Sequence, residues 1–154
     1  MASRRRTPAS PEPLTARVLI VDDDERNAFA ASEALEVLGH ELVVARSGEE
    51  ALRLLLVQEF AVILLDLHMP GMDGYETIRE VRSIARFADL PIIAVTAKAM
   101  KGDRLKCIEA GASDYVSKPV DIDHLVSVLR VCLQRADAIR LASDTVVSLM
   151  PQAS

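Results

Sequence analysis

The segment AVILLDLHMPGMDG, residues 61–74, joins five consecutive aliphatic residues to an aspartate and then to a turn that contains proline and glycine. A continuous apolar run, unlike one that alternates with polar residues, predicts a strand that is buried on both faces. Shorter runs of the same apolar character occur at residues 18–21, 42–45, 92–95 and 115–116. The sequence therefore predicts five strands of a sheet whose two faces are both covered.

Segments with helical periodicity separate these predicted strands. Their apolar residues recur every three or four positions, as on one face of an amphipathic helix. The residues that form these stripes are Ala31, Ala34, Leu35 and Leu38; Ala51, Leu52 and Leu55; Ile78, Val81 and Ala85; Leu105 and Ile108; and Leu125, Val128, Leu129 and Cys132.

Residues at the predicted helix ends support this division. Gly39 and Gly111 stand where the first and fourth helices should end, and glycine suits the left-handed residue that follows a helix. Ser47 and Glu50 predict a capping box at the start of the second helix. Strands that alternate with helices predict the α/β class: a doubly wound parallel sheet with helices on both faces.

The composition indicates one domain with an aliphatic core. Of the 154 residues, 50% are hydrophobic and only 3% are aromatic. The net charge of −5 provides no overall attraction to nucleic acid or to an anionic membrane. No apolar run approaches the roughly 20 residues of a membrane span. Cys107 and Cys132 form no disulfide framework or metal motif, so the expected location is cytoplasmic.

The two ends of the chain differ from its middle. Residues 1–14 are basic and then rich in proline and serine, which predicts a disordered segment. Its arginines, 4–6, are either a solvated tail or an electrostatic tether, and the prolines that follow argue against a signal peptide. We expect the domain to occupy residues 15–135. Residues 136–154 continue the helical stripe, either as a docking or dimerising helix or as a tail that packs locally.

Polar side chains follow four of the predicted strands. Asp22 and Asp23 follow the first strand, Asp66 follows the third, Thr96 the fourth and Lys118 the fifth. In open parallel sheets ligands bind beyond the carboxyl ends of the strands, where the strand order reverses. We therefore expect these side chains to converge at one edge of the sheet.

This combination suits phosphoryl transfer. Three carboxylates in a small space repel one another, and a hard cation such as Mg²⁺ relieves that repulsion. Asp66 stands alone at its strand end, so it is the better nucleophile for an acyl phosphate. Lys118 and the Thr96 hydroxyl would neutralise the remaining phosphoryl oxygens. Pro119 restrains Lys118 toward extended geometry, and a cis bond between them is left open.

Five segments resemble the receiver domain of bacterial two-component response regulators, over about residues 16–134. They are VLIVDDDERN (18–27), SGEEAL (47–52), VILLDLHMPGMDG (62–74), PIIAVTAKAMKGD (91–103) and EAGASDYVSKPVD (109–121). The resemblance implies a flavodoxin-like fold with strand order 2-1-3-4-5. The first and fourth of these segments look most like receivers of stand-alone regulators or hybrid sensor kinases.

The resemblance also implies roles for single residues. Asp22 and Asp23 match the metal-binding acids, Asp66 matches the phosphoacceptor, and His68 matches the position whose backbone carbonyl binds the metal, which would be Mg²⁺ or Mn²⁺. Thr96 and Lys118 match the family's hydroxyl and lysine positions. Tyr115, three residues before Lys118, matches the aromatic residue whose rotamer couples to that hydroxyl.

The implied function is a phosphorylated signalling switch, which catalyses only its own phosphorylation and dephosphorylation. A histidine kinase or histidine phosphotransfer protein would phosphorylate it. The surface formed by the helix around 105–108, the strand at 115–116 and the helix from 125 to 132 would then change and control an unknown downstream protein. We expect no direct contact with nucleic acid or membrane, and either a monomer or a phosphorylation-dependent dimer.

Other functions fit less well. A phosphatase of the haloacid-dehalogenase type would use Asp22 and Asp24, but Arg26 stands where that motif has threonine. A dinucleotide-binding domain would show a G-x-G-x-x-G after the first strand, which is absent. A scaffold that binds a kinase without being phosphorylated, and a receiver piece of a hybrid sensor kinase, both remain open.

Two side chains of the predicted site have alternative interpretations. Metal ligation by the His68 imidazole is disfavoured, because no second histidine stands at ligand spacing. The side chains of His68 and Lys98 could instead tune how water reaches the acyl phosphate. Tyr115 is either the coupled aromatic residue or an ordinary core residue with a solvated hydroxyl.

Overall fold

In the computed structural model, which describes residues 15–97 and 101–149, strands and helices alternate along the chain. Side chains are described for residues 15–97 and 103–138. The predictions for segment 1–14, for Lys98, for residues 150–154 and for the side chains of residues 139–149 lie outside that range. The elements are β1 (Arg17–Val21), α1 (Glu25–Val37), β2 (Glu41–Ala45), α2 (Gly48–Val57), β3 (Val62–Asp66), α3 (Gly74–Ser83), the 3-10 helix η2 (Ala85–Phe87), β4 (Ile92–Thr96), α4 (Lys101–Ala110), β5 (Asp114–Ser117) and α5 (Ile122–Leu149).

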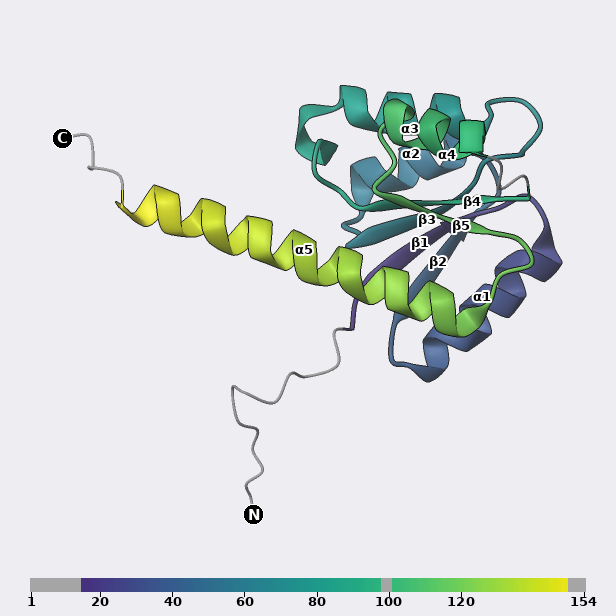
Figure 1. Ribbon diagram of the computed structural model, residues 1–154, viewed down its shortest axis with the longest axis horizontal. Coiled ribbons are helices and arrows are strands. Elements are labelled where there is room, and N and C mark those ends of the chain that lie inside the picture. Colours follow the sequence, from purple (N-terminus) through teal and green to yellow (C-terminus); the bar gives the residue numbers. More distant parts are fainter. Residues whose placement is uncertain (1–14, 98–100, 150–154) are drawn as a thin grey trace, which may run out of the picture.

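The strands form one parallel sheet in the order β2-β1-β3-β4-β5. Helices α2, α3 and α4 cover one face of the sheet, and α1 and α5 cover the other (Figure 1). The predicted α/β class, strand order and flavodoxin-like architecture are therefore confirmed. Because the order reverses between β1 and β3, the chain leaves these two strands toward opposite faces, and the reversal lies beside the ends of both.

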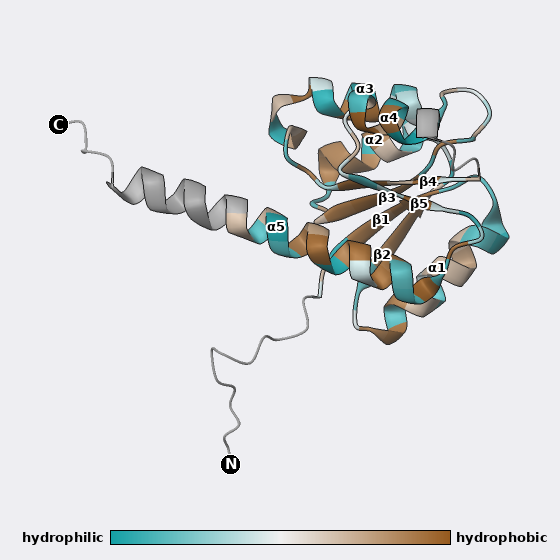
Figure 2. Ribbon diagram, viewed as in Figure 1, coloured by the Kyte–Doolittle hydropathy of each residue, from teal (hydrophilic) through white to brown (hydrophobic). Residues whose placement is uncertain are grey.

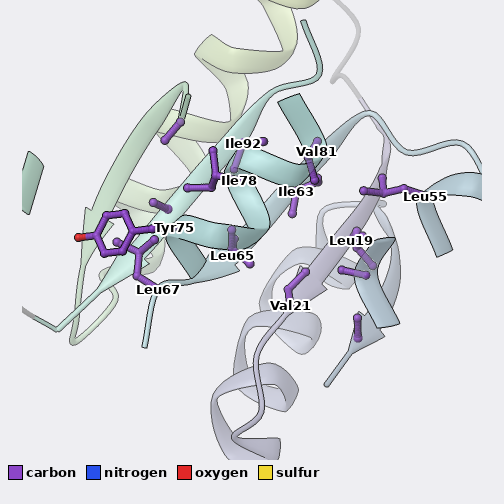
Figure 3. Close-up of a cluster of buried hydrophobic side chains, with 14 of the residues drawn as sticks. Leu19, Val21, Leu55, Ile63, Leu65, Leu67, Tyr75, Ile78, Val81 and Ile92 are labelled. Atoms are coloured by element: carbon purple, nitrogen blue, oxygen red, sulfur yellow. The ribbon is translucent and has the colours of Figure 1, made fainter. Parts of the chain in front are cut away.

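Each face of the sheet has its own hydrophobic core, which explains the continuous apolar runs. Alternate residues of one strand point to opposite faces. In β3, Ile63 and Leu65 pack with α2, α3 and α4, whereas Val62 and Leu64 pack with α1 and α5. Figure 2 shows strands that are mostly hydrophobic between helices that mix hydrophobic and hydrophilic residues, and Figure 3 shows the first of the two cores.

The helix caps agree only in part with the prediction. The Ser47 hydroxyl accepts a hydrogen bond from the Glu50 backbone N–H (3.1 Å), as a capping box requires. The Glu50 carboxylate, however, accepts from the backbone N–H of Arg46 rather than from that of Ser47 (2.6 Å). A complete capping box, which we did not predict from the sequence, joins Asp73 and Glu76 at the start of α3.

Three predicted stripes need correction. Leu38 is the residue after the end of α1, and it is 42% exposed rather than part of a buried stripe. Helix α3 ends at Ser83, so Ala85 belongs to the following 3-10 turn rather than to the helix. In α4, Leu105 and Ile108 are exposed (66% and 45%), while Cys107 between them is fully buried. The core side of α4 is therefore set by Cys107, since two apolar residues alone do not define which side of a short helix faces inward.

The predicted helix-ending glycines are confirmed. Gly39 and Gly111 have φ angles of 95° and 120°, in the left-handed region that favours glycine. After α1, the backbone N–H of Gly39 donates to Glu36 and that of His40 donates to Leu35, which satisfies carbonyls at the helix end. Among the described residues no helix combines the length and apolar character of a membrane span.

Candidate functional site

The ends of four strands bring the predicted side chains to one edge of the sheet. Asp22 directly follows β1, Asp66 and Thr96 are the last residues of β3 and β4, and Lys118 directly follows β5. The backbone N–H of Lys118 donates to the Thr96 carbonyl (2.8 Å), which ties the ends of β4 and β5 together. The Lys118–Pro119 bond is cis, the isomer that the sequence left open.

Three carboxylates cluster at this edge. Asp22, Asp23 and Asp66 each offer an oxygen, and these atoms all lie within 4.8 Å of one another. Asp22 and Asp66 are buried, with 7% and 4% exposure. Burial raises the pKa of Asp22, and the nearby charge of Asp66 raises it further, against a hydrogen bond from the Asp24 backbone N–H (2.9 Å) that lowers it.

The acidic cluster fits a divalent cation by its chemistry. Its donors are carboxylate oxygens, which Mg²⁺ and Mn²⁺ prefer. Asp24, the third acid of the triplet, serves the helix instead, because its side chain accepts from the Arg26 backbone N–H (2.9 Å) and caps α1. A cation at this site would balance the charge of Asp22, whose pKa burial raises, and the charges of its two neighbours.

The Asp66 carboxylate is oriented from two sides. Its Oδ1 accepts from the backbone N–H of His68 (3.1 Å), and its Oδ2 lies 3.4 Å from the Lys118 ammonium. The Lys118 side chain is only 25% exposed, so this ion pair is partly shielded from solvent. These two contacts, one on each oxygen, fix the orientation of the Asp66 carboxylate.

The side chain of His68 makes a contact that we did not predict from the sequence. Its Nε2 lies 3.0 Å from Oγ1 of Thr96, a hydroxyl that is completely buried. Sequence gives no signal for such a bond, because His68 lies after β3, Thr96 ends β4, and the two positions show no spacing relationship. The imidazole therefore contacts another residue of the predicted site.

The loop that carries His68 is held in place by its own residues. Leu67 and Met69, on either side of His68, are buried at 1% and 6% exposure. The loop closes where the Gly74 backbone N–H donates to the Leu67 carbonyl (3.1 Å). A Cβ on Gly74 would lie 2.4 Å from the Leu67 Cα, so only glycine permits this close approach.

Tyr115 lies in β5 and is partly buried, packed against the core on the α2–α3–α4 face. The guanidinium carbon of Arg104, from α4, is 5.5 Å from the centroid of its ring, within the range of a cation–π contact. The ring therefore lies between the core and α4. Its coupling to Thr96 stays a prediction, as does metal binding by the His68 carbonyl.

One cavity adjoins this edge of the sheet, and a larger groove lies at the opposite edge. A cavity of about 250 Å³ adjoins Asp22, Asp66 and Lys118 and continues between α1 and α5. A groove of about 900 Å³ lies at the opposite edge, where the strands begin, and none of the predicted site residues lines it. The smaller cavity is the one that reaches the predicted chemistry.

Comparison with known proteins agrees with this geometry. The sequence model of the family described as "Response regulator receiver domain" matches residues 18–130. The chain is similar to a solved putative response regulator from Chloroflexus aurantiacus, with a TM-score of 0.76 and 34% identity, over 79% of this chain and 99% of that one.

Two curated relatives place similar sequences in longer proteins. The chain is 37% identical over 123 residues to the probable transcriptional regulator ycf27 of Porphyra purpurea, covering 80% of this chain and 49% of the relative. It is 36% identical over 115 residues to the sensor histidine kinase CheAY of Helicobacter pylori, covering 73% of this chain and 14% of the relative. The chain thus spans about half the length of the first curated relatives that it matches.

Proposed function

Because this chain belongs to the response regulator receiver domain family, we propose that it accepts a phosphoryl group on Asp66 from a histidine kinase or a histidine phosphotransfer protein. The observation that carries this proposal is the Asp66 carboxylate itself, which is buried yet lies 3.4 Å from the Lys118 ammonium and beside two further acids. Such an arrangement suits a nucleophile whose product carries more negative charge.

The transfer is a displacement at phosphorus. One oxygen of Asp66 forms a P–O bond as the P–N bond of the donor phosphohistidine breaks. The electron pair of the broken bond stays on the donor imidazole, which takes up a proton from water. Lys118 neutralises one phosphoryl oxygen, and the Thr96 hydroxyl donates a hydrogen bond to another. Hydrolysis of the acyl phosphate later restores the Asp66 carboxylate and releases inorganic phosphate.

The acidic cluster is the proposed cation site. The side chains of Asp22, Asp23 and Asp66, together with the backbone carbonyl of His68, would hold Mg²⁺ or Mn²⁺. When bound, this ion supplies positive charge that neutralises phosphoryl oxygens. Without an ion, the protein's own contribution is to gather three carboxylates whose oxygens lie within 4.8 Å of one another.

The phosphoryl group changes the surface by drawing Thr96 toward Asp66, and Tyr115 follows into the space released. Helix α4, strand β5 and helix α5 then present a different surface to a downstream protein. The change is a population shift whose size is limited by how much better the phosphoryl group contacts the switched state. Tyr115, which packs between the core and Arg104 of α4, is suitably placed for this coupling.

The proposal extends to the setting in which this switch acts. The receiver domain would occupy residues 15–135, with 136–154 as an extension of α5, and would act in the cytoplasm as a monomer or as a phosphorylation-dependent dimer. Stand-alone action is one arrangement. The other is a receiver that forms one part of a hybrid sensor kinase, which its similarity to a sensor histidine kinase supports.

The proposed function is tested by phosphotransfer. Incubation with a phosphorylated histidine kinase and Mg²⁺, or with acetyl phosphate and Mg²⁺, should label the wild type. Asp66→Asn should remain folded by circular dichroism but take up no label. Asp24→Asn is the matched control, because asparagine caps a helix as well as aspartate does. Labelling that survives in Asp66→Asn would refute the proposal, and a wild type that binds a kinase but is never labelled would point to a scaffold.

A further inference from the structure

One hydrogen bond joins two parts of the site that are far apart in sequence. Nε2 of His68 lies 3.0 Å from Oγ1 of Thr96. The hydroxyl is completely buried, while His68 is an exposed residue. Hydrogen bonds to a buried hydroxyl matter more than those at the surface, since water competes less for the partner.

The same histidine also contacts the proposed phosphoacceptor. Its backbone N–H donates to Oδ1 of Asp66 (3.1 Å) while its imidazole binds Thr96. Residue 68 therefore links the carboxylate that gains the phosphoryl group to the hydroxyl that must respond. Buried residues on both sides of it, Leu67 and Met69, fix the position of its backbone.

In the tautomer in which Nε2 of His68 accepts from the Thr96 hydroxyl, a phosphoryl group on Asp66 would compete with the imidazole for the same hydrogen. The Thr96 hydroxyl carries one hydrogen, and to donate it to a phosphoryl oxygen on Asp66 the side chain must turn toward that oxygen. At 3.0 Å, Oγ1 of Thr96 lies within hydrogen-bonding distance of the imidazole. Donation of that single hydrogen to the phosphoryl oxygen therefore ends its donation to the imidazole.

We propose that His68 is a positioning residue that holds the Thr96 hydroxyl in its resting position through its imidazole, and so opposes the switch. The inference rests on the proposed function of Asp66. A single net hydrogen bond changes an equilibrium by roughly 2- to 12-fold. Removing the imidazole contact should therefore make the switched state easier to reach by about this factor.

The experiment measures equilibrium affinity, because this separates positioning from any effect of the side chain on water access. Beryllofluoride mimics a phosphoryl group on a carboxylate, and calorimetric titration at fixed pH and fixed Mg²⁺ gives its dissociation constant. His68→Leu removes the bond. His68→Gln places a polar atom near the position of Nε2 and keeps it. His68→Asn is polar but reaches only to the position of Nδ1. Exposed His124 supplies the control variant His124→Gln.

His68→Leu and His68→Asn should bind beryllofluoride roughly 2- to 12-fold more tightly than the wild type. The dissociation constants of His68→Gln and His124→Gln should stay within about twofold of the wild-type value. Twofold is the smallest change that loss of one hydrogen bond should produce. In a Thr96→Val background, His68→Leu should change nothing further, because the hydroxyl through which it acts is gone. Thermal unfolding checks that each variant is folded.

Several results would overturn the inference. His68→Leu and His68→Asn that bind no more tightly than the wild type would do so, as would His68→Gln that behaves like His68→Leu. A gain from His68→Leu that persists in the Thr96→Val background would show that histidine acts by another route. If the wild type itself failed to bind beryllofluoride with Mg²⁺, the proposed function would fall and this inference with it. Normal wild-type binding with an unchanged His68→Leu overturns the inference alone.

Discussion

The starts and the ends of the same parallel strands form two edges of the sheet, and the cavities at these two edges differ in size and in the burial of the charged residues around them. The groove where the strands begin is the larger, at about 900 Å³, but none of the carboxylates that line it is buried. The cavity where the strands end is about 250 Å³ and adjoins two buried carboxylates, Asp22 and Asp66. Burying a charge is costly without compensation, so buried charge locates the chemistry better than volume does.

The edges also differ in the titratable groups that they bury. At the strand ends, burial raises the pKa of Asp22. At the strand starts, burial lowers the pKa of His40, whose Nδ1 accepts a hydrogen bond from the backbone N–H of Ala16 (3.2 Å). Burial therefore disfavours the charged form of Asp22 at one edge and the charged form of His40 at the other. As pH rises, titration of Asp22 should lower the free energy of unfolding of the protein, and titration of His40 should raise it.

The largest contrast should appear in phosphorylation. Lys118→Met removes the ammonium 3.4 Å from Asp66 Oδ2, and loss of one group that stabilises transition-state charge slows a reaction by about 100-fold or more. Arg86→Met, at the opposite groove, removes a cation that binds the Leu55 carbonyl (3.2 Å). The rate of labelling by acetyl phosphate should fall in the first variant only. Equal labelling rates in Lys118→Met and Arg86→Met would show that the two edges do not differ in function.

A divalent cation should stabilise the strand-end edge. At ten times its dissociation constant, Mg²⁺ should raise the free energy of unfolding by about 1.4 kcal/mol. Thermal unfolding with and without Mg²⁺ measures this, and Asp23→Asn should weaken the response because it removes one carboxylate of the cluster. If the unfolding temperature of the wild type did not change with Mg²⁺, that result would argue against the cation site.

Without a cation, Asp22→Asn should stabilise the protein at neutral pH by about 1 kcal/mol, the usual size of a single-residue effect. The folded pKa of Asp22 is raised above 3.8. As pH rises from 3.8 through that folded pKa, the unfolded chain ionises first and stability falls. Asparagine keeps an acceptor for the Asp24 backbone N–H and removes this fall. Urea unfolding across pH in the presence of a chelator checks the slope, with Asp24→Asn as control.

The smallest effect belongs to His40, at the opposite edge. Its folded pKa lies below 6.5, so its contribution to stability is complete above pH 6.5 and declines as pH falls from 6.5 toward the folded pKa. His40→Asn keeps an acceptor near the position of Nδ1. It should reduce the loss in free energy of unfolding over this pH range by less than about 1 kcal/mol. Its labelling rate should equal that of the wild type. A variant that lost labelling would show that the two edges are coupled.

Sequence was sufficient for the layers of the fold, because strands buried on both faces leave continuous apolar runs. The meeting of Asp22, Asp66 and Lys118 was also predictable, because parallel strands end at one edge. The α4 stripe was not: Leu105 and Ile108 suggested a buried side, yet Cys107 faces the core. A short helix with few apolar residues does not reveal its orientation without its neighbours.

Most features that depend on loop geometry could not be predicted from the pattern of residues in the sequence. The bond between His68 and Thr96 depends on how a loop turns and on one side-chain rotamer, neither of which has a periodic signature. The need for glycine at position 74 comes from the Leu67 backbone, which packs against it only in the folded chain. The Asp73–Glu76 capping box did have a sequence signal, an acidic pair at the spacing of a cap.

The proposed switch depends on a single carboxylate, that of Asp66, receiving the phosphoryl group. Reduction of the phosphorylated protein with borohydride converts a phosphorylated aspartate to homoserine, and peptide mass mapping then identifies its position. We expect homoserine at position 66 and nowhere else in the acidic cluster. Homoserine at position 22 or 23, with residue 66 intact, would contradict the assignment of Asp66 as the phosphoacceptor.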